Sequence, residues 1–355
     1  MRKNTKQIKV GNVLIGGGAP ISIQTMTNTK TQDTTATINQ ILNCEKLGCD
    51  LIRIAINSKE DAHALKIIKK SINIPVIADI QYDYRLALWA HENGADCIRI
   101  NPGNMNRKSD LVELVSNLNS TNTPIRIGVN SGSINLKLID KYGGVTPDCM
   151  VESAINECNL LEDLNFTNFK VAIKSSDVYH TIECYTKFSK LKNYPLHIGI
   201  TEAGPYSSGI VKSSIGLGIL LYNGIGDTLR VSLTDRPETE VVAGINILKS
   251  LNLNSKGINI ISCPTCSRTN GEMIELVKQF ENNLPKINKK LNVAIMGCPV
   301  NGPGEAKEAD VGIALGKNSV TLFKKGKIIR KISVSNAIEE LNKEILSIEM
   351  EPEDE

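Results

Sequence analysis

Between residues 20 and 250, short apolar runs of strand type alternate with longer stretches of helical periodicity. The strand candidates are 21–25, 51–56, 75–80, 97–101, 125–130, 170–174, 196–201 and 227–233. The clearest helical patterns are 36–47, 84–93, 148–164 and 237–251, and Asp235 is placed to cap the last of these ahead of Pro237. Eight such repeats predict an α/β fold, a TIM (β/α)8 barrel, with a Rossmann-like sheet as the weaker alternative. The glycine run at 16–20 precedes the first strand rather than following it, so no dinucleotide site is expected.

Alternation within the strands indicates which side chains share a face. In the strand 97–101, Ile98 and Ile100 point one way and Arg99 points the other. The same pattern recurs in the other strands, where the apolar side can pack against the outer helices. The polar side chains should therefore face the lumen.

These lumen-facing positions are strongly cationic. The cations are Arg53, Arg99, Arg126, Lys174 and Arg230, and they are accompanied by Asn101, Asn130, Asp79 and the strand-end residue Glu202. Two acids cannot neutralise five cations, and unpaired buried charge is costly. An anionic ligand resolves the imbalance, and the arginine fork suits diphosphate oxygens. Internal ion pairs are the alternative interpretation.

Beyond residue 254 the pattern changes, which predicts a barrel domain over 1–254 and a small α/β domain over 255–355. Strands are expected at 258–262 and 291–296, with a helix near 272–282 between them. A hairpin with a KKGK tip and a helix over 336–348 complete this domain, and the acidic tail EPEDE should be disordered.

Nine cysteines occur in the chain. Six fall within apolar segments, at positions 44, 49, 97, 149, 158 and 184, where an inert buried thiol is expected. Cys263 and Cys266 lie at the end of one predicted strand and Cys298 follows the next, which is a ligand-like spacing. All four histidines lie in the barrel, so a structural zinc would lack a fourth soft ligand. An iron–sulfur cluster is favoured over zinc or inert thiols, because it tolerates three thiolates with Glu305 as an oxygen donor.

Composition narrows the class of protein further. The 41 basic and 38 acidic residues nearly balance, and aromatic residues are scarce, so nucleic acid is not an expected partner. The polar N-terminus has no secretion signal, and no apolar run is long enough to cross a membrane. A cytoplasmic protein is expected.

Several motifs carry a resemblance to a known family. They are ISCPTCSRT, MGCPVNGPGE, RIGVNSGS, ADIQYDYRLAL, RINPGN, GITEAG and GIGDTLRVSLT. Together, and in this order along essentially the whole chain, they resemble the compact bacterial form of the 4-hydroxy-3-methylbut-2-enyl diphosphate synthases.

The resemblance implies an oxidoreductase of non-mevalonate isoprenoid synthesis. Such an enzyme reductively opens 2-C-methyl-D-erythritol 2,4-cyclodiphosphate with loss of water, using electrons from ferredoxin or flavodoxin. It also implies a [4Fe-4S] cluster, whose ligands fall on Cys263, Cys266, Cys298 and Glu305. The family's diphosphate-binding and acid–base positions fall on Arg53, Arg99, Asn101, Arg126, Asn130, Lys174 and Glu202. The chain departs from the family at Gln81, where histidine is usual, at Asn57, which replaces a common proline, and around the ligands at Ser267 and Pro299.

Two hypotheses about mechanism follow. Glu202 is the expected proton donor to the departing oxygen. The link from Leu251 to Ile258 spans at most about 25 Å, whereas a barrel with its loops is about 30 Å tall. A head-to-tail homodimer is therefore expected, in which each cluster caps the partner's barrel.

Two alternative hypotheses about function remain. One is a zinc-bearing barrel lyase or transferase for a phosphorylated substrate, and the other is an iron–sulfur redox sensor or electron carrier. A carrier has no use for the cationic lumen.

Overall fold

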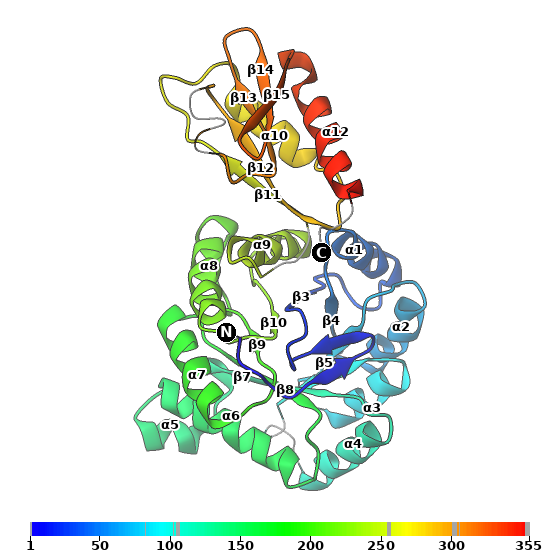
Figure 1. Cartoon of the computed structure of the whole chain (residues 1–355). Coiled ribbons are helices and arrows are strands. Elements are labelled where there is room, and N and C mark those ends of the chain that lie inside the picture. The colour runs from blue at the N-terminus through cyan, green and yellow to red at the C-terminus, as the bar shows by residue number, and fades with distance from the viewer. Residues whose placement is uncertain are drawn as a thin grey trace. The chain divides into compact units, whose positions relative to one another are not determined.

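The computed structural model describes residues 2–81, 83–101, 103, 107–253, 257–299, 304 and 306–351. The chain divides into two compact units, Met1–Leu253 and Asn254–Glu355 (Figure 1). Each unit has a hydrophobic core of its own. No helix in the described part of the chain combines the length and the apolar character needed to cross a bilayer.

The first unit is an eight-stranded parallel barrel, which confirms the predicted fold class. Its strands lie in the order β8-β7-β6-β5-β4-β3-β10-β9. A parallel bridge between Val171 of β8 and Leu196, the residue before β9, brings the two ends of this sheet together. The strands are β3 (Ser22–Met26), β4 (Leu51–Ala55), β5 (Val76–Asp79), β6 (Cys97–Ile100), β7 (Ile125–Asn130), β8 (Phe169–Lys174), β9 (His197–Ile198) and β10 (Thr228–Leu229).

Helices surround these strands (Figure 1). They are α1 (Thr34–Lys46), α2 (Lys59–Lys69), α3 (Tyr84–Glu92), α4 (Lys108–Ser120), α5 (Leu136–Tyr142), α6 (Pro147–Glu162), α7 (Val178–Leu191), α8 (Tyr206–Tyr222) and α9 (Pro237–Ser250). Side chains cap several of them, for example Asp33 on α1 and Thr146 on α6. The predicted cap at Asp235 is wrong, because its carboxylate accepts from the adjacent Arg236 N–H and α9 begins after Arg236 with no side-chain cap.

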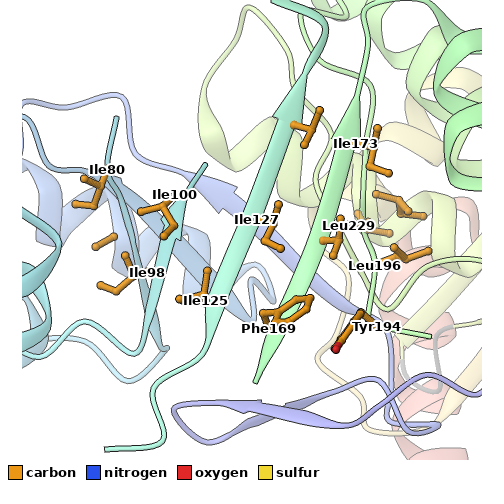
Figure 2. Close-up of a cluster of buried hydrophobic side chains, with 14 of the residues drawn as sticks. Ile80, Ile98, Ile100, Ile125, Ile127, Phe169, Ile173, Tyr194, Leu196 and Leu229 are labelled. Atoms are coloured by element: carbon orange, nitrogen blue, oxygen red, sulfur yellow. The ribbon is translucent and has the colours of Figure 1, made fainter. Parts of the chain in front are cut away.

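The barrel core lies between the strands and the helices. Figure 2 shows Ile98, Ile100, Ile125, Ile127 and Ile173 along neighbouring strands. All five are buried in the same apolar cluster, as the alternation predicts. The predicted inert cysteines 44, 49, 149, 158 and 184 are buried in that cluster as well.

A hairpin that the periodicity did not predict lies against one end of the lumen. It is formed by β1 (Ile8–Val10) and β2 (Val13–Ile15), which pair antiparallel. Ile8, Val10 and Ile15 pack against Leu51, Ile77 and Cys97. Leu51 and Cys97 are the first residues of β4 and β6, so the hairpin closes the barrel at the amino ends of its strands. The carboxyl ends are left for a site.

The second unit is a five-stranded sheet in sequence order, β11 (Gly257–Ser262), β12 (Lys290–Met296), β13 (Val311–Leu315), β14 (Val320–Lys324) and β15 (Lys327–Ile332). The first three strands are parallel and the last two form the predicted hairpin. Helices α10 (Met273–Asn282) and α12 (Ala337–Met350) contribute Phe280, Leu341 and Ile345 to its core. The predicted acidic tail is 351–355, of which residues 352–355 lie outside the described residues.

Candidate active site

A polar cavity of about 160 Å³ opens at the carboxyl ends of the barrel strands. Its lining contains every lumen cation that the alternation predicted, together with Asp79 and Asn130. The full lining is Arg53, Asp79, Gln81, Arg99, Arg126, Asn130, Lys174, Thr201, Arg230 and Ser232. Charged side chains thus converge where active sites of this fold lie.

Asp79, Arg99 and Arg126 form a row across three neighbouring strands, because they are register partners on β5, β6 and β7. Asp79 pairs with Arg99 at 3.1 Å and with Arg53 at 3.6 Å. Burial raises the pKa of the Asp79 carboxyl, but the charges of Arg53, Arg99 and Arg126 outweigh it and hold the pKa below its ordinary value. Asp79 is therefore ionised and shared between two guanidinium groups.

Arg126 has no acidic partner among the described residues. Its side chain is 2% exposed, and its Nε and Nη1 atoms have no hydrogen-bond partner within the described structure. Burial lowers the pKa of Arg126 well below its ordinary value, and the neighbouring Arg53 and Arg99 lower it further. An anion in the cavity would give this group the partner that the chain does not supply.

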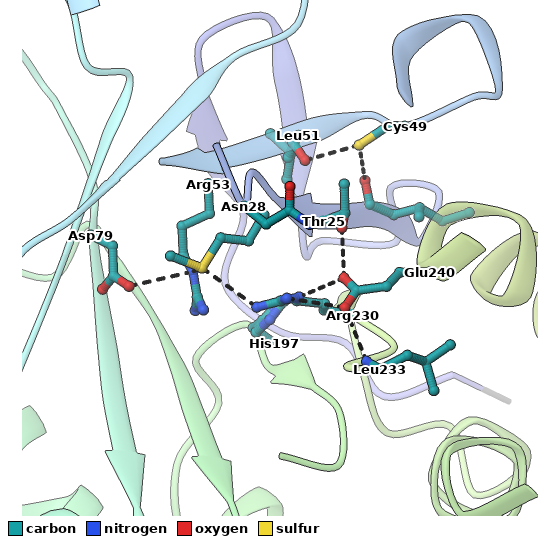
Figure 3. Close-up of polar contacts among 12 residues, drawn as sticks. Thr25, Asn28, Cys49, Leu51, Arg53, Asp79, His197, Arg230, Leu233 and Glu240 are labelled. Carbon is teal, nitrogen blue, oxygen red and sulfur yellow. Dashed lines mark hydrogen bonds and ion pairs between the residues drawn. The ribbon is translucent and has the colours of Figure 1, made fainter. Parts of the chain in front are cut away.

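Arg230 is balanced by an acid that sequence reasoning missed. Glu240 on α9 accepts from Arg230 Nε at 2.9 Å and from Thr25 Oγ1 at 2.6 Å (Figure 3). Glu240 also accepts from the Leu233 N–H at 3.0 Å. Glu240 lies in the first turn of α9, and helical periodicity gives no signal that a residue there reaches the lumen.

His197 is a second residue that sequence reasoning missed, and it lies within hydrogen-bond distance of Lys174. The Lys174 Nζ atom lies 3.2 Å from His197 Nε2, and both side chains are buried. Burial lowers the pKa of Lys174 well below its ordinary value, and Arg126, Arg53 and Arg230 add to this effect. Alternation along β9 could have found His197, because it faces the same way as Gly199 and Thr201.

Two predicted residues lie apart from the cavity lining. The Asn101 side chain is buried, and its amide nitrogen donates to Glu157 Oε1 on α6 at 2.8 Å. Glu202 follows Thr201 at the carboxyl end of the strand, where its side chain is exposed and its backbone has a φ of 51°. Gln81, at the position of the family's usual histidine, lines the cavity.

Gly128 gives Arg99 its room on the lumen face. A methyl group at this position would lie 2.6 Å from Arg99 Nε and 2.8 Å from Nη2, closer than atoms pack. We expect Gly128→Ala to displace the Arg99 guanidinium and to raise KM for the anionic substrate about tenfold, the value of one charge-assisted hydrogen bond.

Steady-state kinetics of Gly128→Ala checks this expectation. The matched control is Gly218→Ala in α8, where nothing lies within 4 Å of the added methyl and KM should stay as it is. An unchanged KM in Gly128→Ala would show that Arg99 does not hold the substrate.

In the second unit, two of the three ligand-like cysteines follow neighbouring parallel strands. Cys263 follows β11 directly, and Cys298 comes two residues after β12, with Ser262 and Ile295 in register. The Gly297 N–H donates to Cys263 Sγ at 3.2 Å, and the Asn270 N–H donates to the Gly297 carbonyl at 2.8 Å. The loop that carries Cys263 and Cys266 is therefore hydrogen-bonded to the segment that carries Cys298.

Cys266 is the exposed member of the three, whereas Cys298 is 6% exposed. The Arg268 backbone N–H lowers the pKa of the Cys266 thiol below its ordinary value. Among the described residues, no three Cys, His, Asp or Glu side chains stand close enough to hold a metal ion. Glu305 lies outside the described residues. Two thiols after neighbouring strands and a third on the adjoining loop, with an N–H donor on one sulfur, are the ligand type that an iron–sulfur cluster takes.

The fold and the two sites define a class, a β/α-barrel protein with a cationic cavity at the carboxyl ends of its strands and a second unit that carries three cysteines. Residues 5–245 match the GcpE TIM-barrel domain, and residues 259–347 match the GcpE protein C-terminal domain. The chain belongs to this family.

Curated relatives agree with this membership over nearly the full length. A protein of Caldanaerobacter subterraneus is 52% identical over 345 residues, which cover 97% of each chain. One of Ruminiclostridium cellulolyticum is also 52% identical and covers 97% of this chain and 98% of its own. Both are named 4-hydroxy-3-methylbut-2-en-1-yl diphosphate synthase (flavodoxin). Among solved structures, a dihydropteroate synthase from Stenotrophomonas maltophilia covers 70% of this chain and 97% of its own, with a TM-score of 0.52 and 13% identity, and shares the barrel fold.

Proposed function

We propose that this chain is a reductase that converts 2-C-methyl-D-erythritol 2,4-cyclodiphosphate to 4-hydroxy-3-methylbut-2-enyl diphosphate and water. The observation that carries the proposal is the cationic cavity. Five cations line it, and Asp79 and Glu240 are the acids that pair with them. A diphosphate supplies the missing negative charge, and forked guanidinium groups match its oxygens.

Each side chain at the cavity has a role in this proposal. Arg53, Arg99, Arg126 and Lys174 clamp the diphosphate, and Arg230 borders it while Glu240 fixes the Arg230 side chain. Asn130 contributes an amide at the end of β7. Asp79 holds Arg53 and Arg99 in place. Asn101, whose amide donates to Glu157, is kept as a substrate-binding residue. Glu202, which is exposed and outside the cavity lining, is proposed as the acid because the family resemblance implies that role.

The second unit is proposed to hold a [4Fe-4S] cluster through Cys263, Cys266, Cys298 and Glu305. When bound, the cluster supplies electrons one at a time. The Gly297 N–H on Cys263 Sγ supports this assignment, because hydrogen bonds to ligand sulfurs tune a cluster's potential. Flavodoxin is the proposed electron donor, after the names of the relatives.

Anaerobic turnover tests the function. Reconstituted protein is given the cyclic diphosphate and a one-electron reductant, and phosphorus NMR identifies the product. The butenyl diphosphate should form with reductant and should not form without it. Conversion of a phosphorylated substrate to an unreduced product by zinc-loaded protein without reductant would favour a lyase, and a verified cluster without product would favour an electron carrier.

We also propose a head-to-tail homodimer in which the cluster of one chain serves the barrel of its partner. Within the first unit, α9 returns the chain to the amino ends of the strands, where Leu251 and Leu253 lie beside Ile21. The cavity opens at the opposite ends. The short stretch after Leu253 supports the view that the cluster serves a second copy.

Apolar side chains on α8 support an association of this kind. Val211, Ile215, Ile219 and Tyr222 are 54, 50, 41 and 84% exposed, which forms an uncovered stripe along the helix. A second copy of this chain is the occupant we assign to it.

Mixed dimers test the arrangement. A Cys298→Ala subunit has an intact barrel, and an Arg126→Ala subunit has an intact cluster site. After subunit exchange at equal amounts, half of the dimers are mixed and each holds one complete site, so about a quarter of the wild-type rate should return. Proven exchange without any recovered activity would show that each cluster serves its own barrel.

A further inference from the structure

Glu240 reaches the edge of the cavity from α9 and makes more contacts than its ion pair with Arg230 requires. It lies in the first turn of the helix, and its side chain is 3% exposed. One oxygen accepts from Thr25 Oγ1 at 2.6 Å and from Arg230 Nε at 2.9 Å. The other accepts from the Leu233 N–H at 3.0 Å and from Arg230 Nη2 at 3.1 Å (Figure 3). A single buried carboxylate therefore joins β3, the strand-end arginine and the segment that follows β10.

The contact with Arg230 fixes the plane of its guanidinium group. Two parallel N–H···O bonds to one carboxylate set the orientation of an arginine as well as its position. Arg230 Nη1 also donates to the Met26 sulfur at 3.6 Å, and Arg53 Nε donates to the same sulfur at 3.0 Å. Because a thioether is a weak acceptor, Glu240 is the stronger of the two groups that orient Arg230.

The contact with Leu233 leads to the turn that carries Glu202. Leu233 precedes Thr234, whose N–H donates to the Gly204 carbonyl at 2.9 Å. The Leu233 side chain also comes close to α8, because a methyl group on Gly209 would lie 2.7 Å from its Cδ2 atom. The segment after β10 is therefore in direct contact with the chain that follows Glu202.

The backbone of Glu202 depends on such support. Its φ of 51° lies in the left-handed region, which residues other than glycine seldom adopt. A backbone in this region persists where the surrounding structure fixes it. The Thr201 N–H donates to the Ser175 carbonyl at 3.2 Å on one side of this turn, and the bond from Thr234 closes the other side. The orientation of the Glu202 carboxyl therefore depends on how firmly these two contacts hold.

We propose that Glu240 is a positioning residue with two separate tasks. Through Arg230 it orients the guanidinium group that borders the diphosphate, and through Leu233 it holds the turn from which Glu202 acts. The inference rests on the proposed function, since the diphosphate and the role of Glu202 as the acid come from there. Glu240 itself is outside the cavity lining, so it acts on the substrate only through these neighbours.

Two substitutions separate the two tasks. Glu240→Gln keeps one oxygen for the Leu233 N–H, while its amide group can donate to Thr25 Oγ1 and no longer accepts from Arg230 Nε. Arg230 must then be ordered when the substrate binds, so KM for the cyclic diphosphate should rise about tenfold, with kcat within about twofold of the wild type. Glu240→Leu removes both acceptors, so a similar rise in KM should be joined by a fall in kcat of about 100-fold.

An Arg230→Met background shows whether the KM effect acts through Arg230. The guanidinium group is absent there, so adding Glu240→Gln should no longer raise KM. A rise of the same size in both backgrounds would mean that Glu240 acts without Arg230, which overturns the first task.

Hydrogen exchange of backbone amides follows the second task without turnover. The N–H groups of Leu233 and Thr234 are bonded to Glu240 and to the Gly204 carbonyl. In Glu240→Leu both should exchange faster, whereas in Glu240→Gln both should keep the wild-type rate. Mass spectrometry of the oxidised full-length protein measures these rates, and equal rates in Glu240→Leu and the wild type would overturn the second task.

Asp227 provides a matched control at the amino ends of the strands. It is 1% exposed and, like Glu240, holds an arginine, a threonine and a backbone N–H. Its partners are Arg2 Nη2 at 2.7 Å, Thr5 Oγ1 at 3.1 Å and the Leu196 N–H at 2.9 Å. Asp227→Asn should lower Tm, as Glu240→Leu does, while KM and kcat stay at the wild-type values.

The outcomes separate this inference from the proposed function. If the wild type does not turn over the cyclic diphosphate, the proposed function fails and the inference fails with it. If the wild type is active but KM does not rise in Glu240→Gln, or if kcat is no lower in Glu240→Leu than in Glu240→Gln, the inference alone is overturned. The same changes in KM and kcat in Asp227→Asn would also overturn it, because any buried acid of the barrel would then have this effect.

Discussion

Replacing Arg126 with methionine will make the protein more heat-stable and nearly inactive. Arg126 is buried, and none of the described acids pairs with it. An apolar side chain of similar length removes the cost of burying that charge, so unfolding should require about 1–4 kcal/mol more and Tm should rise by several degrees. The same change removes a guanidinium fork from the diphosphate and should lower kcat/KM about 100-fold or more.

Calorimetric melting and steady-state kinetics measure the two effects together. The control is Arg330→Met in β15, where the arginine is 42% exposed and pairs with Glu340 and Glu344. Pairs of this kind contribute at most about 1 kcal/mol, so Tm should change little and kcat/KM should stay at the wild-type value. A lower Tm in Arg126→Met would mean that Arg126 is already compensated without a ligand.

Cys298→Ala is expected to abolish turnover while the barrel still binds substrate. Cys298 follows β12, beside the segment whose Gly297 N–H donates to Cys263 Sγ. Loss of one of three thiolates should leave less iron after reconstitution and lower turnover by roughly 1,000-fold or more, since the substrate then receives no electrons. Iron and sulfide analysis measures the cluster content, a turnover assay measures the activity, and calorimetry measures substrate binding.

Cys44→Ala is the matched control, because Cys44 is a fully buried thiol in the barrel core. It should retain iron and turnover, with a stability loss of about 1 kcal/mol from the lost packing. Full turnover by Cys298→Ala would exclude Cys298 as a ligand.

Most of the barrel prediction rests on the alternation of side chains along the strands. It placed Arg99 and Arg126 in the lumen and Ile98 and Ile127 in the core, because the pleat leaves each side chain with one of two faces. The boundaries were poorer at the last two strands. Residues 196–201 and 227–233 were predicted as strands, whereas β9 and β10 have two residues each, since Gly199 and the closing bridge leave little regular pairing there.

The missed residues depend on contacts between distant segments. Glu240 reaches Arg230 from a helix, and Tyr185 joins two strands through its hydroxyl. The hairpin β1–β2 lies in a segment with only three-residue strands, so it has too few residues to show periodicity. His197 was overlooked for another reason. It stands in an apolar run, where alternation places it on the same face as Gly199 and Thr201 but does not distinguish a structural histidine from a functional one.

The most direct test of the central claim is the number of electrons consumed per product. The account predicts that reduced flavodoxin, or a chemical one-electron donor, loses two electrons for each butenyl diphosphate formed and loses none without the cyclic diphosphate. Conversion of the cyclic diphosphate to another, unreduced product without electron consumption would identify a lyase. Steady electron consumption without product would identify an electron carrier, and either result would contradict a reductase that joins the barrel cavity to the cysteine site.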